Sequence, residues 1–267
     1  MKPLLTMDNL EVRFASAGKT ERIVVGKFNL EIFPAESLAL VGESGCGKTT
    51  IARAALRLID SPGKITHGKI FFGEEDVLAV PERRLRQIRW KEIALIFQEP
   101  ASALNPLYRA GGQVAEVLRL HLRLDTKAAK AKTLQLFEAV DLPDGERCFN
   151  AYPHELSSGM RQRVMIAMAM ACEPRLIIAD EPTSALDARH QREVLECLQG
   201  LKRKHGLSLL FITHDLNLVA TWASRIAIMH AGKIVEAGAT AEILARPQHP
   251  QTRQLLEAAE RFNRTVP

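Results

Sequence analysis

The chain has 267 residues, with 36 lysines and arginines against 31 aspartates and glutamates, so its formal net charge is +5. This length suits one large α/β domain or a core with an inserted subdomain, and the scattered basic residues argue against a dedicated nucleic-acid-binding protein. The four cysteines have no CxxC spacing, so we expect a reducing compartment. Residues 1–30 lack the pattern of a signal peptide, and no window approaches the ~20 apolar residues that cross a bilayer. We therefore expect any membrane role to be performed from outside the bilayer.

The N-terminal part of the sequence predicts strands that lead into a glycine-rich loop. Apolar and polar residues alternate over residues 4–14 and 22–33, which indicates antiparallel strands. Residues 37–42 form an apolar run that indicates a buried strand, and residues 49–59 have helical spacing. Between them, residues 42–49 read GESGCGKT and fit the pattern GxxxxGK[ST]. A strand, this loop and a helix in that order are the context in which the pattern binds phosphate.

The residue types of this loop explain the chemistry that it favours. Glycines let successive backbone N–H groups point inward as an anion nest, Lys48 can reach the terminal phosphates, and the Thr49 hydroxyl can ligate Mg²⁺. The pattern arises by chance in a chain of this length about once in a hundred. We therefore expect a nucleotide to be held by Gly42, Ser44, Gly45, Cys46, Gly47, Lys48, Thr49 and Thr50.

The middle of the chain changes character. Residues 68–78 predict a short hairpin, residues 81–90 a basic helix, and residues 92–98 a buried strand. Residues 99–153 favour helix, with a loop expected over residues 143–153. This segment predicts a helical insert.

Strands and helices alternate again after the insert, as in a parallel α/β core. The expected order is strand 175–182, helix 188–204, strand 207–214, helix 216–223 and strand 225–238, followed by a short helical tail. The strand 175–182 delivers Asp180 and Glu181 to its end. Two adjacent carboxylates there could simply cap a helix, but behind a phosphate loop Asp180 would hold Mg²⁺ through water and Glu181 would polarise a water for attack on the γ-phosphate.

Residues 154–187, HELSSGMRQRVMIAMAMACEPRLIIADEPTSALD, resemble the signature segment, Walker B motif and D-loop of ATP-binding cassette (ABC) proteins. The phosphate loop, IFQEP at 96–100 and ITHD at 212–215 stand in the order of that family, and the resemblance covers essentially the whole chain. It implies an α/β fold with a P-loop NTPase (RecA-like) core, an antiparallel β subdomain and an inserted helical subdomain.

The resemblance also implies domain boundaries. Residues 1–98 and 154–240 would form the ATP-binding core with its β subdomain, residues 99–153 the helical subdomain, and residues 241–267 a short C-terminal helical tail.

The same resemblance implies roles for single residues. Gln98 matches the Q-loop glutamine, which contacts Mg²⁺ and the attacking water, and His214 matches the switch histidine; with Glu181 they make up the expected catalytic set. The metal ligands would be Thr49, Gln98 and Asp180.

Two further motifs match surfaces by which cassettes meet in a dimer. Leu156, Ser157, Gly159 and Met160 match the signature, which meets the γ-phosphate bound by the opposite subunit. Ser184 to Asp187 match the D-loop, which crosses the dimer seam, with Asp187 near the nucleotide.

The sequence departs from the family pattern at two points. Ser158 stands where the signature usually has the first of two glycines, which would make this face a weaker donor to the partner's nucleotide unless serine is simply accommodated. Phe14 is the candidate for stacking on adenine, with a core phenylalanine on an amphipathic strand as the alternative.

The family resemblance sets the expected task. A chain without membrane spans must transmit its ATP-driven conformational change to other subunits. An ABC ATPase that acts on DNA would need a long coiled coil, whereas the insert has only about fifty residues and no sustained heptads. Residues 99–116 and 246–258 are similar to the cassettes of bacterial importers for oligopeptides, dipeptides and nickel. We expect import of di- or oligopeptides, with a nickel or metal-chelate importer as the alternative.

This task implies cofactors, partners and a location. ATP and Mg²⁺ are the expected cofactors. The expected partners are a second cassette, identical or different, two membrane permeases and, indirectly, an extracytoplasmic solute-binding protein, without nucleic acid. The expected place is the cytoplasmic face of the inner membrane.

Overall fold

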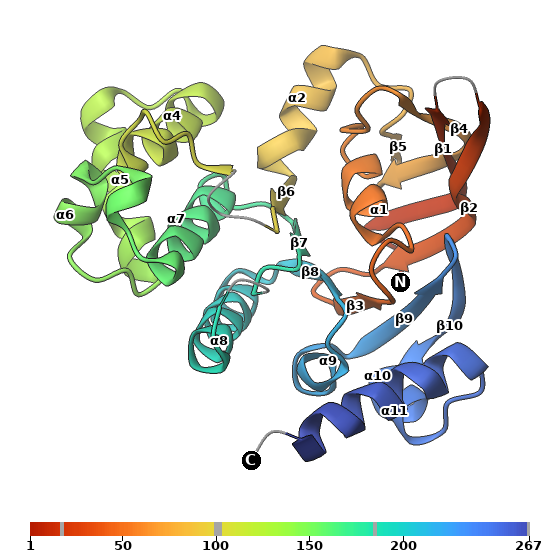
Figure 1. Ribbon diagram of the computed structural model, residues 1–267. Helices are drawn as coiled ribbons and strands as arrows, with labels where there is room; N and C mark the ends of the chain where they lie inside the picture. The colour runs from red at the N-terminus through yellow and green to blue at the C-terminus, as the bar shows by residue number, and fades with distance from the viewer. Residues whose placement is uncertain (17–18, 99–102, 184–185, 266–267) are drawn as a thin grey trace. The chain divides into compact units, whose positions relative to one another are not determined.

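The computed structural model describes residues 1–16, 19–98, 103–183 and 186–265 (Figure 1). It divides into two compact units, which we describe one at a time: unit 1 is Met1–Leu85 with Ser208–Pro267, and unit 2 is Arg86–Leu207. The domain boundaries expected from the sequence stay a prediction.

Unit 1 contains an antiparallel sheet near the N-terminus. Its strands are β1 (Leu5–Ser16), β2 (Lys19–Ile32), β4 (Gly63–Phe72) and the short β5 (Glu75–Asp76), in the order β2-β1-β4-β5. Leu5 and Met7 of β1 are both buried, because alternate residues of a strand point to the same face of the sheet and this face is covered. The antiparallel strands and the hairpin expected from the sequence are confirmed.

Unit 1 also carries the parallel strands beside the glycine loop. β3 (Ser37–Val41) pairs in parallel with β8 (Ser208–Thr213) and β9 (Arg225–His230). Every residue of β3 and β8 is buried, which is why these strands read as continuous apolar runs. The expectation of one strand over 225–238 is wrong: Ala231 and Gly232 have positive φ (46° and 80°), and this turn joins β9 to the antiparallel β10 (Lys233–Ala239).

The first helix of unit 1 is shorter than the sequence indicates. α1 (Lys48–Ala54) ends before the expected limit at residue 59, and Arg57 with a φ of 51° follows it. After β8 come α9 (Leu216–Trp222), α10 (Thr240–Ala245), which packs on β10, and α11 (Pro250–Thr265). The helical tail is confirmed. α2 (Glu82–Lys91) begins in unit 1 and ends in unit 2.

Unit 2 combines two parallel strands with a group of helices, which Figure 1 shows in colours from yellow-green to teal. β6 (Ile93–Ile96) pairs in parallel with β7 (Leu176–Asp180), and both are fully buried. The helices are α4 (Ala110–Leu122), α5 (Thr126–Ala139), α6 (Gly145–Asn150), α7 (Ser158–Met170) and α8 (Ala188–His205), with a 3₁₀ helix at Pro153–Glu155.

The helical insert is confirmed, but its details differ from the sequence-based expectation. Arg123 has a φ of 57° and Asp125 caps α5, its Oδ1 accepting from the Ala128 N–H at 2.8 Å, so two helices replace one continuous run. The loop expected over residues 143–153 is wrong, because Asp144 caps α6 within it. None of the described helices is long and apolar enough to cross a membrane.

Candidate nucleotide-binding site

The glycine loop of unit 1 runs from the end of β3 into the first turn of α1. Gly45 and Gly47 have φ angles of 80° and 108°, which L side chains rarely adopt. A Cβ on Gly42 would lie 2.2 Å from the backbone oxygen of Met229 in β9, and a Cβ on Gly47 would lie 3.0 Å from the Met229 side chain. The loop is therefore a tight cradle lined by backbone, which fits a phosphate chain. Met229 was not expected from the sequence.

Lys48 points back into this loop. Its side chain is buried, and its Nζ donates to the backbone oxygens of Gly42 at 2.7 Å and Glu43 at 3.0 Å. The Cys46 thiol is also buried, and burial raises its pKa against the opposing effect of Lys48. Thr49 and Thr50 are half-buried on the first turn of α1, whereas Ser44 and Gly45 are exposed. The structure thus brings the whole expected phosphate-binding set together.

His214 leaves the sheet beside this loop. In the register of the parallel pair β3 and β8, Val41 lies opposite Thr213. Gly42 and His214 therefore leave neighbouring strands at the same edge, the carboxyl edge at which such sheets bind ligands. The His214 side chain is exposed.

Phe14, the candidate for adenine stacking, lies on β1. Its side chain is half-buried, and its ring covers Gly63 of β4, where a Cβ would come within 2.6 Å of Phe14 Cε1. Close packing on β4 accounts for the glycine at position 63. A role of Phe14 toward adenine stays a prediction.

In unit 2, Gln98 and Glu181 form a pair. β6 and β7 are parallel, with Ile96 opposite Ala179, so the residues that follow both strands leave at one edge. The Gln98 Nε2 donates to Glu181 Oε2 at 3.1 Å. Asp180, the last residue of β7, is buried, and Glu181 has a φ of 45°, uncommon for a residue with a side chain. The expected Q-loop glutamine and the expected general base are therefore in direct contact.

The signature residues occupy the start of α7. Ser157 is the N-cap, and its Oγ accepts from the Met160 N–H at 3.2 Å. Ser158 is the first helical residue and is not among the described residues with positive φ, so the backbone there does not require glycine. A Cβ on Gly159 would lie 3.3 Å from the ring of His190 in α8, so the helices approach closely at this glycine.

His190 also contacts Asp187, the N-cap of α8. Asp187 Oδ1 accepts from the His190 backbone N–H at 3.0 Å, and the ring Nδ1 lies 2.8 Å from Oδ2. These hydrogen bonds, the backbone one first, lower the pKa of the Asp187 carboxyl. No role was expected for His190, although an aspartate at the start of a helix is a visible capping signal. Ser184 and Ala185 of the expected D-loop lie outside the described residues.

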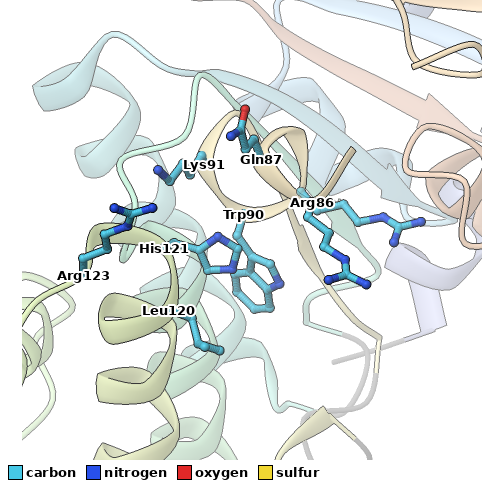
Figure 2. A pocket seen from close by; sticks show the side chains of 8 residues that line it. Arg86, Gln87, Trp90, Lys91, Leu120, His121 and Arg123 are labelled. Atoms are coloured by element: carbon cyan, nitrogen blue, oxygen red, sulfur yellow. The ribbon is translucent and has the colours of Figure 1, made fainter. Parts of the chain in front are cut away.

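Unit 2 also has a cavity of about 540 Å³, lined by residues of α2 and α4 and by Arg123, which follows α4 (Figure 2). The pKa of His121 in this lining is lowered, chiefly by burial and then by Lys91, which favours the neutral imidazole. Trp90 has a φ of 73°, a strained conformation for an aromatic residue. The described lining contains no carboxylate and consists of Arg86, Gln87, Arg89, Trp90, Lys91, Leu120, His121 and Arg123.

Comparison with known proteins agrees with this geometry. A family model described as "ABC transporter" matches residues 25–184, more than half of the chain. Among curated proteins, the chain is 47% identical over 96% of its length to the peptidoglycan transport ATP-binding protein YejF of Agrobacterium fabrum, of which it spans only 47%. It is 44% identical over 97% of its length to the dipeptide transport ATP-binding protein DppD of Haemophilus influenzae, and it spans 78% of that protein.

Solved structures show the same relationship. The dimeric structure of a post-hydrolysis state of the ATP-binding cassette MJ0796 bound to ADP and Pi has a TM-score of 0.79 and 26% identity, over 88% of this chain and 98% of that one. The fold class expected from the sequence is thereby confirmed. With the phosphate loop formed and the family model matched across it, the chain belongs to the ABC transporter family as one of its ATP-binding, ATP-hydrolysing cassettes.

Proposed function

We propose that this cassette powers a bacterial importer of di- or oligopeptides. The relatives that support this proposal are named for transport of dipeptides, oligopeptides and peptidoglycan, at 40–47% identity over nearly the whole chain. The observation that carries the enzymatic part is the Gln98–Glu181 hydrogen bond, because it holds a general base at the edge where β7 ends.

In the proposed reaction, the phosphate loop of unit 1 binds the phosphates of MgATP. The backbone N–H groups of the loop and Lys48 bind the phosphates, with Lys48 exchanging its loop carbonyls for phosphate oxygens. Thr49 would offer Mg²⁺ a hydroxyl oxygen and Asp180 a carboxylate oxygen, the types of ligand that this ion prefers. The ion would supply positive charge against the phosphates.

Water activation falls to Glu181. Gln98 fixes its carboxylate, Glu181 accepts a proton from the attacking water, and the bond between the β,γ-bridging oxygen and the γ-phosphorus breaks to leave ADP and phosphate. His214, from the end of β8, would contact the γ-phosphate as it separates.

We propose that hydrolysis also needs a second cassette. The positive end of α7, with the Ser157 hydroxyl and the amides near Gly159, would face the γ-phosphate bound by the partner. Asp187 would stand at the same seam, where the His190 contacts keep it ionised. Because Ser158 is helical, it fits here without backbone strain, and any weakening must come from its hydroxymethyl group.

The basic cavity of unit 2 suits an acidic segment of a membrane subunit. Its four cationic side chains would meet a carboxylate of a permease, and the indole of Trp90 would meet apolar side chains (Figure 2). This contact would hold the cassette on the cytoplasmic face of the inner membrane. The charge reversal Arg123→Glu should reduce co-purification with the permeases, whereas Arg203→Glu on α8, an exposed site that does not line the cavity, serves as a control.

Reconstitution tests the whole proposal. The cassette, its partner cassette, two permeases and the binding protein encoded beside it are placed in proteoliposomes, and uptake of a labelled dipeptide and of ⁶³Ni²⁺ is measured with and without ATP. We expect ATP-dependent dipeptide uptake that Glu181→Gln abolishes. Uptake of nickel alone would establish the alternative substrate class and refute peptide import.

A further inference from the structure

The start of α11 is anchored on a single carboxylate of β10. Glu236 Oε1 accepts from the backbone N–H of Gln248 at 2.8 Å, and Oε2 accepts from the backbone N–H of His249 at 3.0 Å and from the Thr252 hydroxyl. Thr252 is completely buried. Burial alone would raise the pKa of Glu236, but these hydrogen bonds outweigh it and lower the pKa. The carboxylate therefore stays ionised and fixes the first turn of the helix.

This anchor directs Gln251 toward the phosphate loop. The Gln251 side chain is 8% exposed, and its Nε2 donates to Glu43 Oε1 at 2.8 Å. The two residues are 208 positions apart in the sequence. Glu43 itself is an exposed residue of a glycine-rich loop, so an almost buried amide restrains an otherwise solvent-facing side chain.

Glu43 is also the residue whose backbone faces Lys48. Its carbonyl oxygen accepts from Lys48 Nζ at 3.0 Å and from the Cys46 N–H at 3.3 Å. Its side chain and its carbonyl thus link α11 on one side with the phosphate-binding lysine on the other. A shift of Glu43 would change the curvature of the phosphate loop and would move the carbonyl oxygen that accepts from the Lys48 ammonium.

We propose that Gln251 is a positioning residue for ATP binding, which acts through Glu43 to keep the phosphate loop in its nucleotide-binding curvature. The Glu236 anchor fixes α11, Gln251 holds the Glu43 carboxylate, and the Glu43 backbone keeps its place beside Lys48. Gln251 does not touch the reacting atoms, so it acts by preorganising the phosphate loop in the ATP-free protein.

The proposal predicts a change in KM without a matching change in kcat. In Gln251→Ala, the loop loses one charge-assisted hydrogen bond, which should raise KM and Kd for MgATP about fivefold. The kcat at saturating ATP should stay within twofold of wild type, because bound phosphates then order the loop. The matched control is Gln254→Ala, which removes the same side chain from an exposed position of the same helix.

A double-mutant cycle separates this role from general stabilisation of α11. ATPase kinetics and displacement of a fluorescent ATP analogue are measured on the full chain for Gln251→Ala, Glu43→Ala and the double variant, with thermal unfolding in parallel. If the two residues act as one link, the double variant binds MgATP no more weakly than the worse single variant.

The exchanged pair Glu43→Gln with Gln251→Glu provides a rescue. It restores one donor and one acceptor in reversed order, so its KM should return toward wild type, whereas Gln251→Glu alone should raise KM further by setting two carboxylates side by side. The proposal is overturned if Gln251→Ala leaves KM and Kd unchanged, if the effects of the two single variants add, or if the exchanged pair is as impaired as Gln251→Glu.

Discussion

Replacing Gly42 by alanine should damage nucleotide binding through a steric clash with backbone. The added Cβ would lie 2.2 Å from the Met229 carbonyl oxygen and 2.8 Å from Cys46 Sγ, whereas real Cβ contacts stay above 3.0 Å. The oxygen or the loop must therefore shift by at least 0.8 Å (3.0 − 2.2). Met229 belongs to β9, which pairs with β3 through the preceding residues and with β10 at Met229 itself, so the loop has to move.

The expected magnitude follows from the cost of overpacking. Forcing an extra methyl group into a close-packed site costs about 1–3 kcal/mol. If this cost falls on the nucleotide-binding curvature of the loop, the Kd for MgATP rises about 5- to 150-fold, at about 1.4 kcal/mol per factor of ten.

The assay is a titration with a fluorescent ATP analogue, with urea unfolding in parallel. Gly200→Ala is the matched control: no atom lies within 4 Å of its would-be Cβ, and an alanine inside α8 should stabilise the protein by about 0.5–1 kcal/mol without changing Kd. A Gly42→Ala protein that is folded and binds MgATP within twofold of wild type would refute the cradle geometry.

Two further predictions concern titratable groups. Because burial raises the pKa of Cys46, its alkylation by a maleimide should be slow near pH 7 and should accelerate about tenfold per pH unit. The alkylation should abolish nucleotide binding, and bound MgATP should prevent it. Equally fast inactivation of Cys46→Ser would mean that another cysteine reacts. The lowered pKa of Asp187 contributes stability that is complete above the pKa of an unfolded aspartate and is lost as the pH falls through the folded pKa. The variant His190→Ala removes the ring contact but keeps the backbone one, so the pKa of Asp187 measured by NMR should rise toward its ordinary value of 3.8. An unmoved pKa would contradict the assignment.

The local patterns of the sequence were sufficient for most elements and for the motif residues. Continuous apolar runs gave β3, β7 and β8, and the order of motifs gave the loop from Gly42 to Thr50. The resemblance paired Gln98 with Glu181 in function, and the structure places them in contact.

The features that sequence reasoning missed depend on distant contacts or on single backbone angles. Met229 and Gln251 reach the phosphate loop from far along the chain, and nothing in their local sequence marks that approach. The break between α4 and α5 follows from one left-handed residue, Arg123, and a cap at Asp125, within a stretch whose composition favours helix throughout. Such breaks depend on a few side-chain hydrogen bonds, which the spacing of apolar residues over a long window does not reveal.

The central claim is that Glu181, held by Gln98, activates water in an ATP site completed by a second cassette. Its most direct test is phosphate release at saturating MgATP by wild type and Glu181→Gln in the reconstituted transporter, with retained nucleotide and mass measured by size-exclusion chromatography. The account predicts that the glutamine variant loses about 100-fold or more in turnover but still binds ATP and accumulates as an ATP-bound cassette dimer, because the amide keeps the geometry and loses the charge that attracts the proton. Wild-type turnover in the variant, or a loss of ATP binding as large as the loss of turnover, would contradict it.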